Sequence, residues 1–285
     1  MFFEVLKAFF FGLVEGITEW LPVSSTGHLV LFDNFIKMDV SDEFMEMFTV
    51  VIQLGAIMAV IILYFTKLNP FSRKKTPEAR KATWSLWGKV VVGCIPAAIV
   101  GVLLDDWADE HFYNAVVIAG ALILYGVIFI IIERVNKNRG SHATYKVENV
   151  EDLDLLTAFK IGCFQCLAIV PGTSRSGSTI IGGLLCGCSR VAASEFSFFM
   201  AIPVMFGWSI LKIAKMLLGG IVLTTTEIAV GIVGIVVAFV VSVISIKFLM
   251  SYIQKHDFGV FGYYRIALAI VVLVAVFGFG MSAAA

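Results

Sequence analysis

The sequence predicts an all-α polytopic membrane protein, and three observations carry that prediction. Of its 285 residues, 59% are hydrophobic and only 15% are charged, whereas a soluble domain has roughly 25% charged residues. Several apolar runs approach or exceed the roughly 20 residues that an α-helix needs to cross a bilayer. Two polar stretches, 15–28 and 171–179, interrupt these apolar runs and open with similar patterns.

The first apolar run, 2–21, is short and polar for a membrane span. It contains Glu4, Glu15 and Glu19 and is ended by Pro22, because the residue before a proline disfavours helix. We therefore expect a helix that enters the membrane and turns back, with a return limb at 29–36. An interfacial loop should follow at 37–43. Three spans are then predicted, at 44–65, 90–104 and 114–132.

The second half of the chain repeats this order. Residues 155–187 again give an apolar helix, a Pro-Gly break, a polar stretch and a short apolar limb, and three further spans are predicted at 194–217, 227–248 and 265–283. A shift of 150 residues aligns Leu6 with Leu156, Ala8 with Ala158, Phe9 with Phe159, Gly12 with Gly162, Ser24 with Ser174 and Gly27 with Gly177. It also places Glu15 on Gln165 and Thr26 on Ser176. We predict one membrane domain built from two repeats, 1–150 and 151–285.

Each repeat holds one re-entrant helical hairpin and three spans, so six spanning helices and two hairpins are expected in total. An odd number of spans per repeat inserts the second copy upside down, which is an inverted-topology repeat. The two hairpins then enter from opposite faces and their polar tips meet near the midplane. Irregular backbone at that depth requires protein or a water-filled cavity around it, so a buried cleft is expected there.

The charges of the loops predict the orientation in the membrane. Loops 66–89 and 133–154 contain most of the Lys and Arg and are assigned to the cytoplasm by the positive-inside rule. The acidic loop 105–113 is then outside, as is 218–226, and 249–264 is inside. Lys212 and Lys215 oppose the rule and are expected to snorkel to the interface.

The first polar stretch has the residue types of a reactive site. Glu15 and Glu19 are four residues apart, so they share one face of a helix and could hold a divalent cation (Mg²⁺ or Ca²⁺) or act as acid and base. Ser25 and His28 follow in a turn with Ser24, Thr26 and Gly27. His28 could deprotonate a serine, protonate a leaving group or attack phosphorus itself.

The second polar stretch has the residue types of an anion site. Arg175 keeps its charge and offers a planar fork that suits phosphate oxygens. Glycines let backbone N–H groups approach an anion, and the N-terminus of a return helix would point at the same anion. The candidate phosphate-binding residues are Ser24, Thr26, Gly27, Thr173, Ser174, Ser176, Gly177 and Thr179. Alternatively, Arg175 pairs with a glutamate of the first hairpin, and such a pair could open for substrate.

Together the two stretches predict phosphoryl chemistry within a membrane. No Walker A sequence occurs in the chain, so nucleotide hydrolysis is not supported, and no nucleic-acid partner is expected. A rival interpretation is a transporter or flippase of a polyprenyl phosphate, because inverted repeats with paired hairpins are typical of transporters. The carboxylate, serine and histidine cluster exceeds what transport needs, which favours an enzyme.

With both stretches assigned, the sequence resembles the undecaprenyl-diphosphate phosphatase family, also called the bacitracin-resistance family. The resemblance lies in residues 15–28, 51–55, 161–166, 171–177 and 189–198. It implies a bacterial inner-membrane enzyme that removes the terminal phosphate of a C55 polyprenyl diphosphate and regenerates the carrier lipid for cell-wall synthesis. It also implies a divalent metal requirement and resistance to bacitracin, which competes by sequestering the diphosphate lipid. A second copy of the chain, in a homodimer, is a further candidate partner.

The family's roles are carried over to matching positions only. The carboxylate pair falls on Glu15 and Glu19, the proposed nucleophile on Ser25, its helper on His28, and the phosphate-binding arginine on Arg175. Attack by water in place of Ser25 stays open. The other class of membrane lipid phosphatase needs a His after a Ser-Arg pair at set spacing, and none follows Ser174–Arg175 or Ser189–Arg190.

Overall fold

The structure, a computed structural model, describes residues 1–138, 145–220 and 223–280 and contains no β-strand within these ranges. Its first half consists of α1 (Phe2–Thr18), α2 (Ser25–Phe35), α3 (Asp42–Leu63), α4 (Phe65–Leu68), α5 (Pro77–Phe112) and α6 (Ala115–Asn138). Its second half consists of η1 (Val150–Asp152), α7 (Leu155–Gln165), η2 (Cys166–Ile169), α8 (Arg175–Leu185), α9 (Arg190–Leu218), α10 (Thr225–Ile253), α11 (Gly259–Leu273) and the π-helical η3 (Val274–Gly278).

Six of the described helices are long and apolar enough to span a membrane, as expected. They cover Glu43–Leu63, Pro77–Asp105, Ala115–Lys137, Arg190–Met216, Thr225–Ile253 and Gly259–Gly278. Each matches one predicted span, although most extend beyond the predicted limits. The predicted loops 133–154 and 218–226 and the predicted span 265–283 fall partly outside the described residues.

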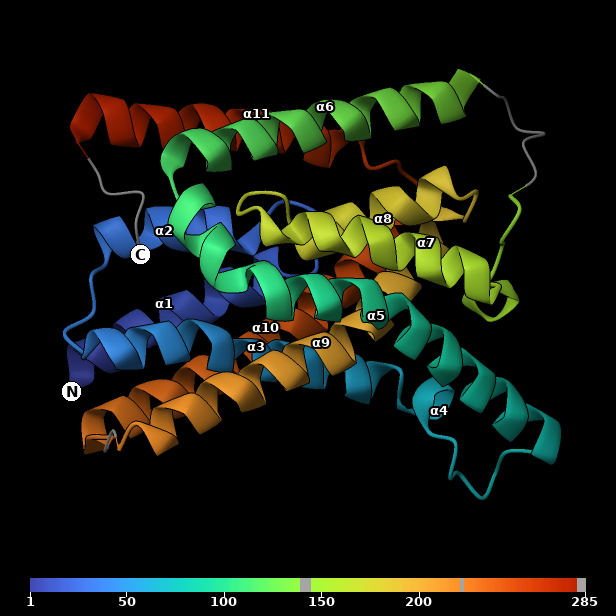
Figure 1. Ribbon diagram of the computed structural model, residues 1–285, viewed down its shortest axis with the longest axis horizontal. Coiled ribbons are helices and arrows are strands. Elements are labelled where there is room, and N and C mark those ends of the chain that lie inside the picture. Colours follow the sequence, from blue (N-terminus) through green and yellow to red (C-terminus); the bar gives the residue numbers. More distant parts are fainter. Residues whose placement is uncertain (139–144, 221–222, 281–285) are drawn as a thin grey trace.

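The largest difference from prediction lies in the basic loop 66–89, of which the second half is helical. Thr76 caps α5 by accepting a hydrogen bond from the Ala79 N–H, and Pro77 occupies the first turn, where its missing N–H costs nothing. The charged residues that marked this segment as a loop are good helix formers. The helix continues through Pro96 and bends along its length (Figure 1).

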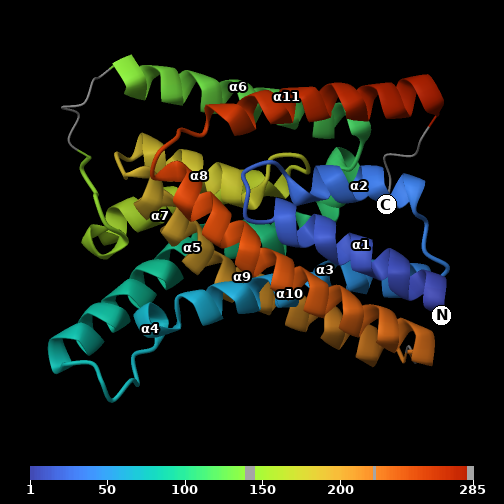
Figure 2. The same ribbon diagram turned by 180° about the vertical axis from the view of Figure 1, so that it is seen from behind.

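Two short helix pairs enter the bundle from opposite ends. Figures 1 and 2 show α1 and α2 approaching from the end that holds the N-terminus, and α7 and α8 from the opposite end. Their tips, here residues 19–24 (the first tip) and 170–174 (the second tip), meet in the middle. On one side the tips are covered by α6 and α11, which lie side by side.

The helices of each half pack mainly against helices of the other half. Helix α1 packs on α10 while α7 packs on α5, and α3 packs on α10 while α9 packs on α5. Glycines permit close approaches in both the α1–α10 and the α7–α5 pairs. A Cβ at Gly12 would lie 2.6 Å from Gly234 O, and a Cβ at Gly162 would lie 2.1 Å from Gly93 O. This correspondence does not contradict the predicted repeat, and both the repeat and its inverted orientation in a bilayer stay predictions.

Candidate active site

The two tips share one unusual backbone feature. Ser24 has φ 73° and Ser174 has φ 72°, and they are the only described non-glycine residues with positive φ. Each caps the helix that follows: Ser24 Oγ accepts from Gly27 N at 3.3 Å, and Ser174 Oγ from Gly177 N at 3.1 Å. A non-glycine residue in this conformation costs of order 1–3 kcal/mol and persists only where its surroundings enforce it. The strained residue therefore occupies the same place in both halves, the N-cap of the second helix of the hairpin.

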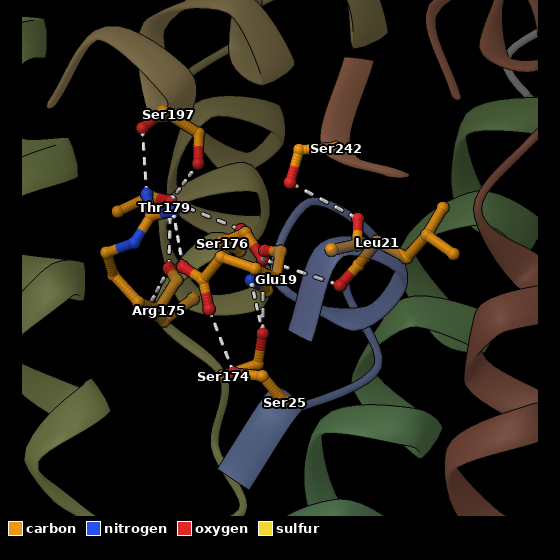
Figure 3. Close-up of polar contacts among 12 residues, drawn as sticks. Glu19, Leu21, Ser25, Ser174, Arg175, Ser176, Thr179, Ser197 and Ser242 are labelled. Atoms are coloured by element: carbon orange, nitrogen blue, oxygen red, sulfur yellow. Dashed lines mark hydrogen bonds and ion pairs between the residues drawn. The ribbon is translucent and has the colours of Figure 1, made fainter. Parts of the chain in front are cut away.

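Glu19 joins the reactive residues of the first tip to the arginine of the second half. Its Oε2 accepts a hydrogen bond from Ser25 Oγ at 2.8 Å, and its Oε1 accepts one from Arg175 Nη2 at 2.9 Å (Figure 3). Arg175 also donates from Nη1 to Ser197 O at 2.9 Å and lies over the Trp20 ring. The structure thus brings Glu19, Ser25 and Arg175 into one site, and it contains the predicted pairing of Arg175 with a glutamate.

The hydroxyl groups of the second polar stretch make structural hydrogen bonds, one of which joins the two halves. Ser176 Oγ donates to Glu19 O at 2.9 Å, which ties α8 directly to the first tip (Figure 3). Ser178 and Thr179 donate to Arg175 O at 3.0 and 2.9 Å, and Thr179 also bonds Ser197 Oγ at 2.7 Å. These bonds order the α8 N-terminus, whose first backbone N–H groups have no partner within the helix.

The remaining predicted phosphate-binding residues flank these contacts. Thr173 is buried in the second tip directly before Ser174, and its carbonyl accepts a hydrogen bond from Arg265. Thr26 and Gly27 lie in the first turn of α2, next to Ser25. All of them therefore adjoin the helix N-termini at which the two tips meet.

Glu15 is buried beside this site without a hydrogen-bond partner for either carboxylate oxygen. Gln165, its counterpart in the second half, is also buried, and both ends of its amide are unpartnered. Buried polar groups are normally satisfied, so these two groups are available to bind water, a cation or substrate. Within the described residues, no group of three or more His, Cys, Asp or Glu side chains could hold a metal by itself.

His28 contacts different partners from those expected. Its Nδ1 lies 2.7 Å from Ser24 O and its Nε2 lies 2.7 Å from Tyr264 Oη, with the two rings nearly parallel. A carbonyl only accepts, so Nδ1 carries the proton and, in neutral histidine, Nε2 accepts from the tyrosine. Ser25 is bonded to Glu19 instead of to His28.

Comparison with known proteins places the chain in a family. Residues 8–271 match the family described as "Bacitracin resistance protein BacA". The chain belongs to the BacA family. It is similar to proteins named undecaprenyl-diphosphatase from Enterococcus faecalis (56% identity; 96% of this chain and 98% of the relative covered), Latilactobacillus sakei (56%; 96% and 98%) and Acetivibrio thermocellus (53%; 95% and 97%). With its six apolar helices, this member of the BacA family is a multi-pass bacterial membrane protein.

In this BacA-family site, sequence reasoning missed three residues. Ser197 O binds Arg175, Tyr264 binds His28, and the fully buried Arg265 binds carbonyls of both tips. Only Arg265 had a usable signal, because a charged residue within an apolar run is expensive in a membrane and usually functional. Ser197 acts through its main chain, which no side-chain pattern encodes.

Proposed function

We propose that this chain hydrolyses the terminal phosphate of undecaprenyl diphosphate, giving undecaprenyl phosphate and inorganic phosphate and so recycling the carrier lipid of cell-wall synthesis. The observation that carries the proposal is the bridge made by Glu19, which holds Ser25 Oγ at 2.8 Å and Arg175 Nη2 at 2.9 Å. A carboxylate base, a hydroxyl nucleophile and a cation for phosphate oxygens are the parts that phosphoryl transfer needs. The names of the relatives support the lipid substrate.

In the proposed reaction, Glu19 accepts the proton of Ser25 as Oγ attacks the terminal phosphorus. The Oγ–P bond forms while the P–O bond of the anhydride breaks, and undecaprenyl phosphate leaves with the electron pair. Water then attacks the phosphorus of the phosphoserine, and its oxygen forms the new P–O bond as the Oγ–P bond breaks. Glu19 returns its proton to Ser25 Oγ, and the oxygen and both hydrogens of the water leave in the released inorganic phosphate. Arg175 exchanges its bond with Glu19 for phosphate oxygens, because a guanidinium fork binds them in two places.

We assign His28 a positioning role. Its Nδ1–H donates to Ser24 O, so the ring holds the strained turn immediately before the proposed nucleophile. The hydroxyl of Tyr264 fixes the ring from the other side. Glu19, which accepts the Ser25 hydrogen bond, takes the part of proton acceptor that the sequence suggested for His28.

A divalent cation such as Mg²⁺ or Ca²⁺ fits the donor set around Glu15. Its two buried carboxylate oxygens lack partners, Glu19 lies four residues away, and hard cations prefer such oxygen ligands. Two carboxylates are few for a protein cage, but Mg²⁺ is commonly held by one or two carboxylates together with substrate phosphates. Such a cation would neutralise charge on the diphosphate when bound.

The apolar outer faces of the helices suit the prenyl chain. Large hydrophobic side chains of α1 and α7, including Phe9 and Phe159, are exposed on the protein surface, where lipid would surround them. The diphosphate would reach the two tips while the tail lies between spans. Bacitracin would act on the substrate, as the family resemblance implies. The proposed site lies within one chain, so a homodimer is not required for it.

The test is phosphate release by purified protein in detergent from a polyprenyl diphosphate. Wild type should release inorganic phosphate, and Ser25→Ala and Arg175→Ala should lose about 100-fold or more of the turnover. Ser209→Ala is a matched control, because Ser209 is fully buried on α9 and bonds Val50 O away from the tips. A wild-type protein that binds the lipid but releases no phosphate would support a transporter instead.

A second measurement separates covalent from direct hydrolysis. Acid quenching during turnover of a radiolabelled diphosphate should leave label on Ser25, and Ser25→Ala should carry none. Full turnover by Ser25→Ala would assign the attack to water.

A further inference from the structure

Arg265 connects the two tips from a third element, α11 (Gly259–Leu273). Its side chain is fully buried. Nη1 donates to Pro22 O at 3.1 Å in the first tip, and Nη2 donates to Gly172 O at 2.7 Å and Thr173 O at 2.8 Å in the second tip. All three acceptors are main-chain carbonyls at the breaks where the helices of each hairpin end.

The charge of Arg265 is not balanced by a carboxylate. Among the described residues it forms no ion pair, whereas Arg175 pairs with Glu19. Its guanidinium lies over the Tyr125 ring at 5.7 Å, and its Nε–H has no partner. Carbonyl dipoles and an aromatic face offset part of the cost of a buried cation, but a full negative charge would offset it better.

The same guanidinium lies beside the proposed phosphate site. A Cβ added to Gly177 would be 3.2 Å from Arg265 Nη1, and Gly177 is in the first turn of α8, at the helix N-terminus that faces the tips. Arg175 is paired with Glu19 in this site, so Arg265 adds a second positive charge, one without a carboxylate partner, beside the place proposed for an anionic substrate.

We propose that Arg265 is a positioning residue for the phosphatase reaction: it fixes the separation of the two tips, and its unpaired charge favours the diphosphate at their junction. The inference rests on the proposed function. Because Ser25 and Glu19 belong to the first half and Arg175 to the second, their alignment depends on how the tips are held. A small misplacement of reacting groups can cost about 100-fold in rate.

Two substitutions separate the geometric from the electrostatic effect. Arg265→Lys keeps the charge, but one ammonium cannot replace a fork that reaches three carbonyls, so kcat should fall about tenfold or more with a smaller rise in KM. Arg265→Gln removes the charge as well, and its KM for a prenyl diphosphate should rise about tenfold beyond that of Arg265→Lys. The matched control is Arg134→Lys, an exposed arginine of α6 that bonds Tyr263, and it should keep both constants.

Rates are expressed per folded protein, measured by size exclusion and thermal unfolding in detergent. Turnover within threefold of wild type in both Arg265 variants would overturn the proposal, as would losses equal to the loss of folded protein. If both variants aggregate, Tyr125→Leu removes the ring beneath the guanidinium while leaving Arg265, and it should raise KM at least threefold, whereas Tyr125→Phe should not. An unchanged KM in Tyr125→Leu would then refute the proposal. A wild-type protein without phosphate release would instead refute the proposed function itself.

Discussion

Replacing Glu19 by glutamine tests the central contact of the site with almost no change of shape. The carboxylate accepts from Ser25 Oγ at 2.8 Å and from Arg175 Nη2 at 2.9 Å. A glutamine has one acceptor oxygen and one NH₂ group. If the oxygen faces Arg175, the NH₂ group donates to Ser25, so the serine proton has no acceptor.

The expected loss follows from the value of a general base, about 10²–10⁴-fold in rate, which equals about 2.7–5.4 kcal/mol at 1.36 kcal/mol per tenfold. KM should stay unchanged or fall, because Arg175 loses the charge that competes with phosphate. The assay is steady-state phosphate release from a polyprenyl diphosphate in detergent.

A matched control is Glu227→Gln. Glu227 is also buried, but it accepts from Thr224 in the capping box of α10 and from Ser41, the N-cap residue of α3. This variant should therefore lose stability and keep its kcat per folded protein. Turnover of Glu19→Gln within threefold of wild type would refute the reasoning. An increased KM with unchanged kcat would make Glu19 a binding group and not a base.

Three further predictions concern packing, a buried ion pair and a metal. Gly55→Ala should destabilise the fold by roughly 1–3 kcal/mol, because its Cβ would lie 2.1 Å from Ile235 O. The control Gly231→Ala, whose Cβ would have no atom within 4 Å, should not, and equal melting temperatures of the two variants would contradict the prediction. Arg190 donates to the buried Glu133 at 2.9 and 2.5 Å, and Arg190→Ala removes both bonds. The free energy of unfolding should therefore fall by roughly 1.5–3 kcal/mol, and an unchanged thermal unfolding curve would contradict the prediction. Chelation by EDTA should abolish phosphate release and added Mg²⁺ or Ca²⁺ should restore it; full activity in EDTA would exclude the metal.

Much of the fold followed from hydrophobicity alone. Long apolar runs have few alternatives in a membrane, so six spans were predicted at close to their observed places. The limits of α5 were missed because composition labelled 77–89 as polar loop, while the cap at Thr76 and the helix propensity of charged residues continue the helix into it.

The candidate site was predicted as a set of residues but not as a set of contacts. The polar stretches and the meeting of Arg175 with a glutamate could be predicted, since charged and hydroxyl groups at membrane depth need partners. The pairing of Ser25 with Glu19 could not, because a proline break separates them and spacing no longer fixes geometry. Arg265 escaped because its partners are carbonyls of Pro22, Gly172 and Thr173, which any sequence would supply.

The packing of α1 on α10 and of α7 on α5 has a consequence for how the protein is made. The hairpin of each half packs on a helix of the other half. When only the first 150 residues have been synthesised, α1 therefore lacks its main neighbour, α10, and Glu19 lacks Arg175. The two halves therefore need each other to complete the fold. Expressed as separate polypeptides in one cell, each should be degraded alone, and together they should assemble into a working enzyme.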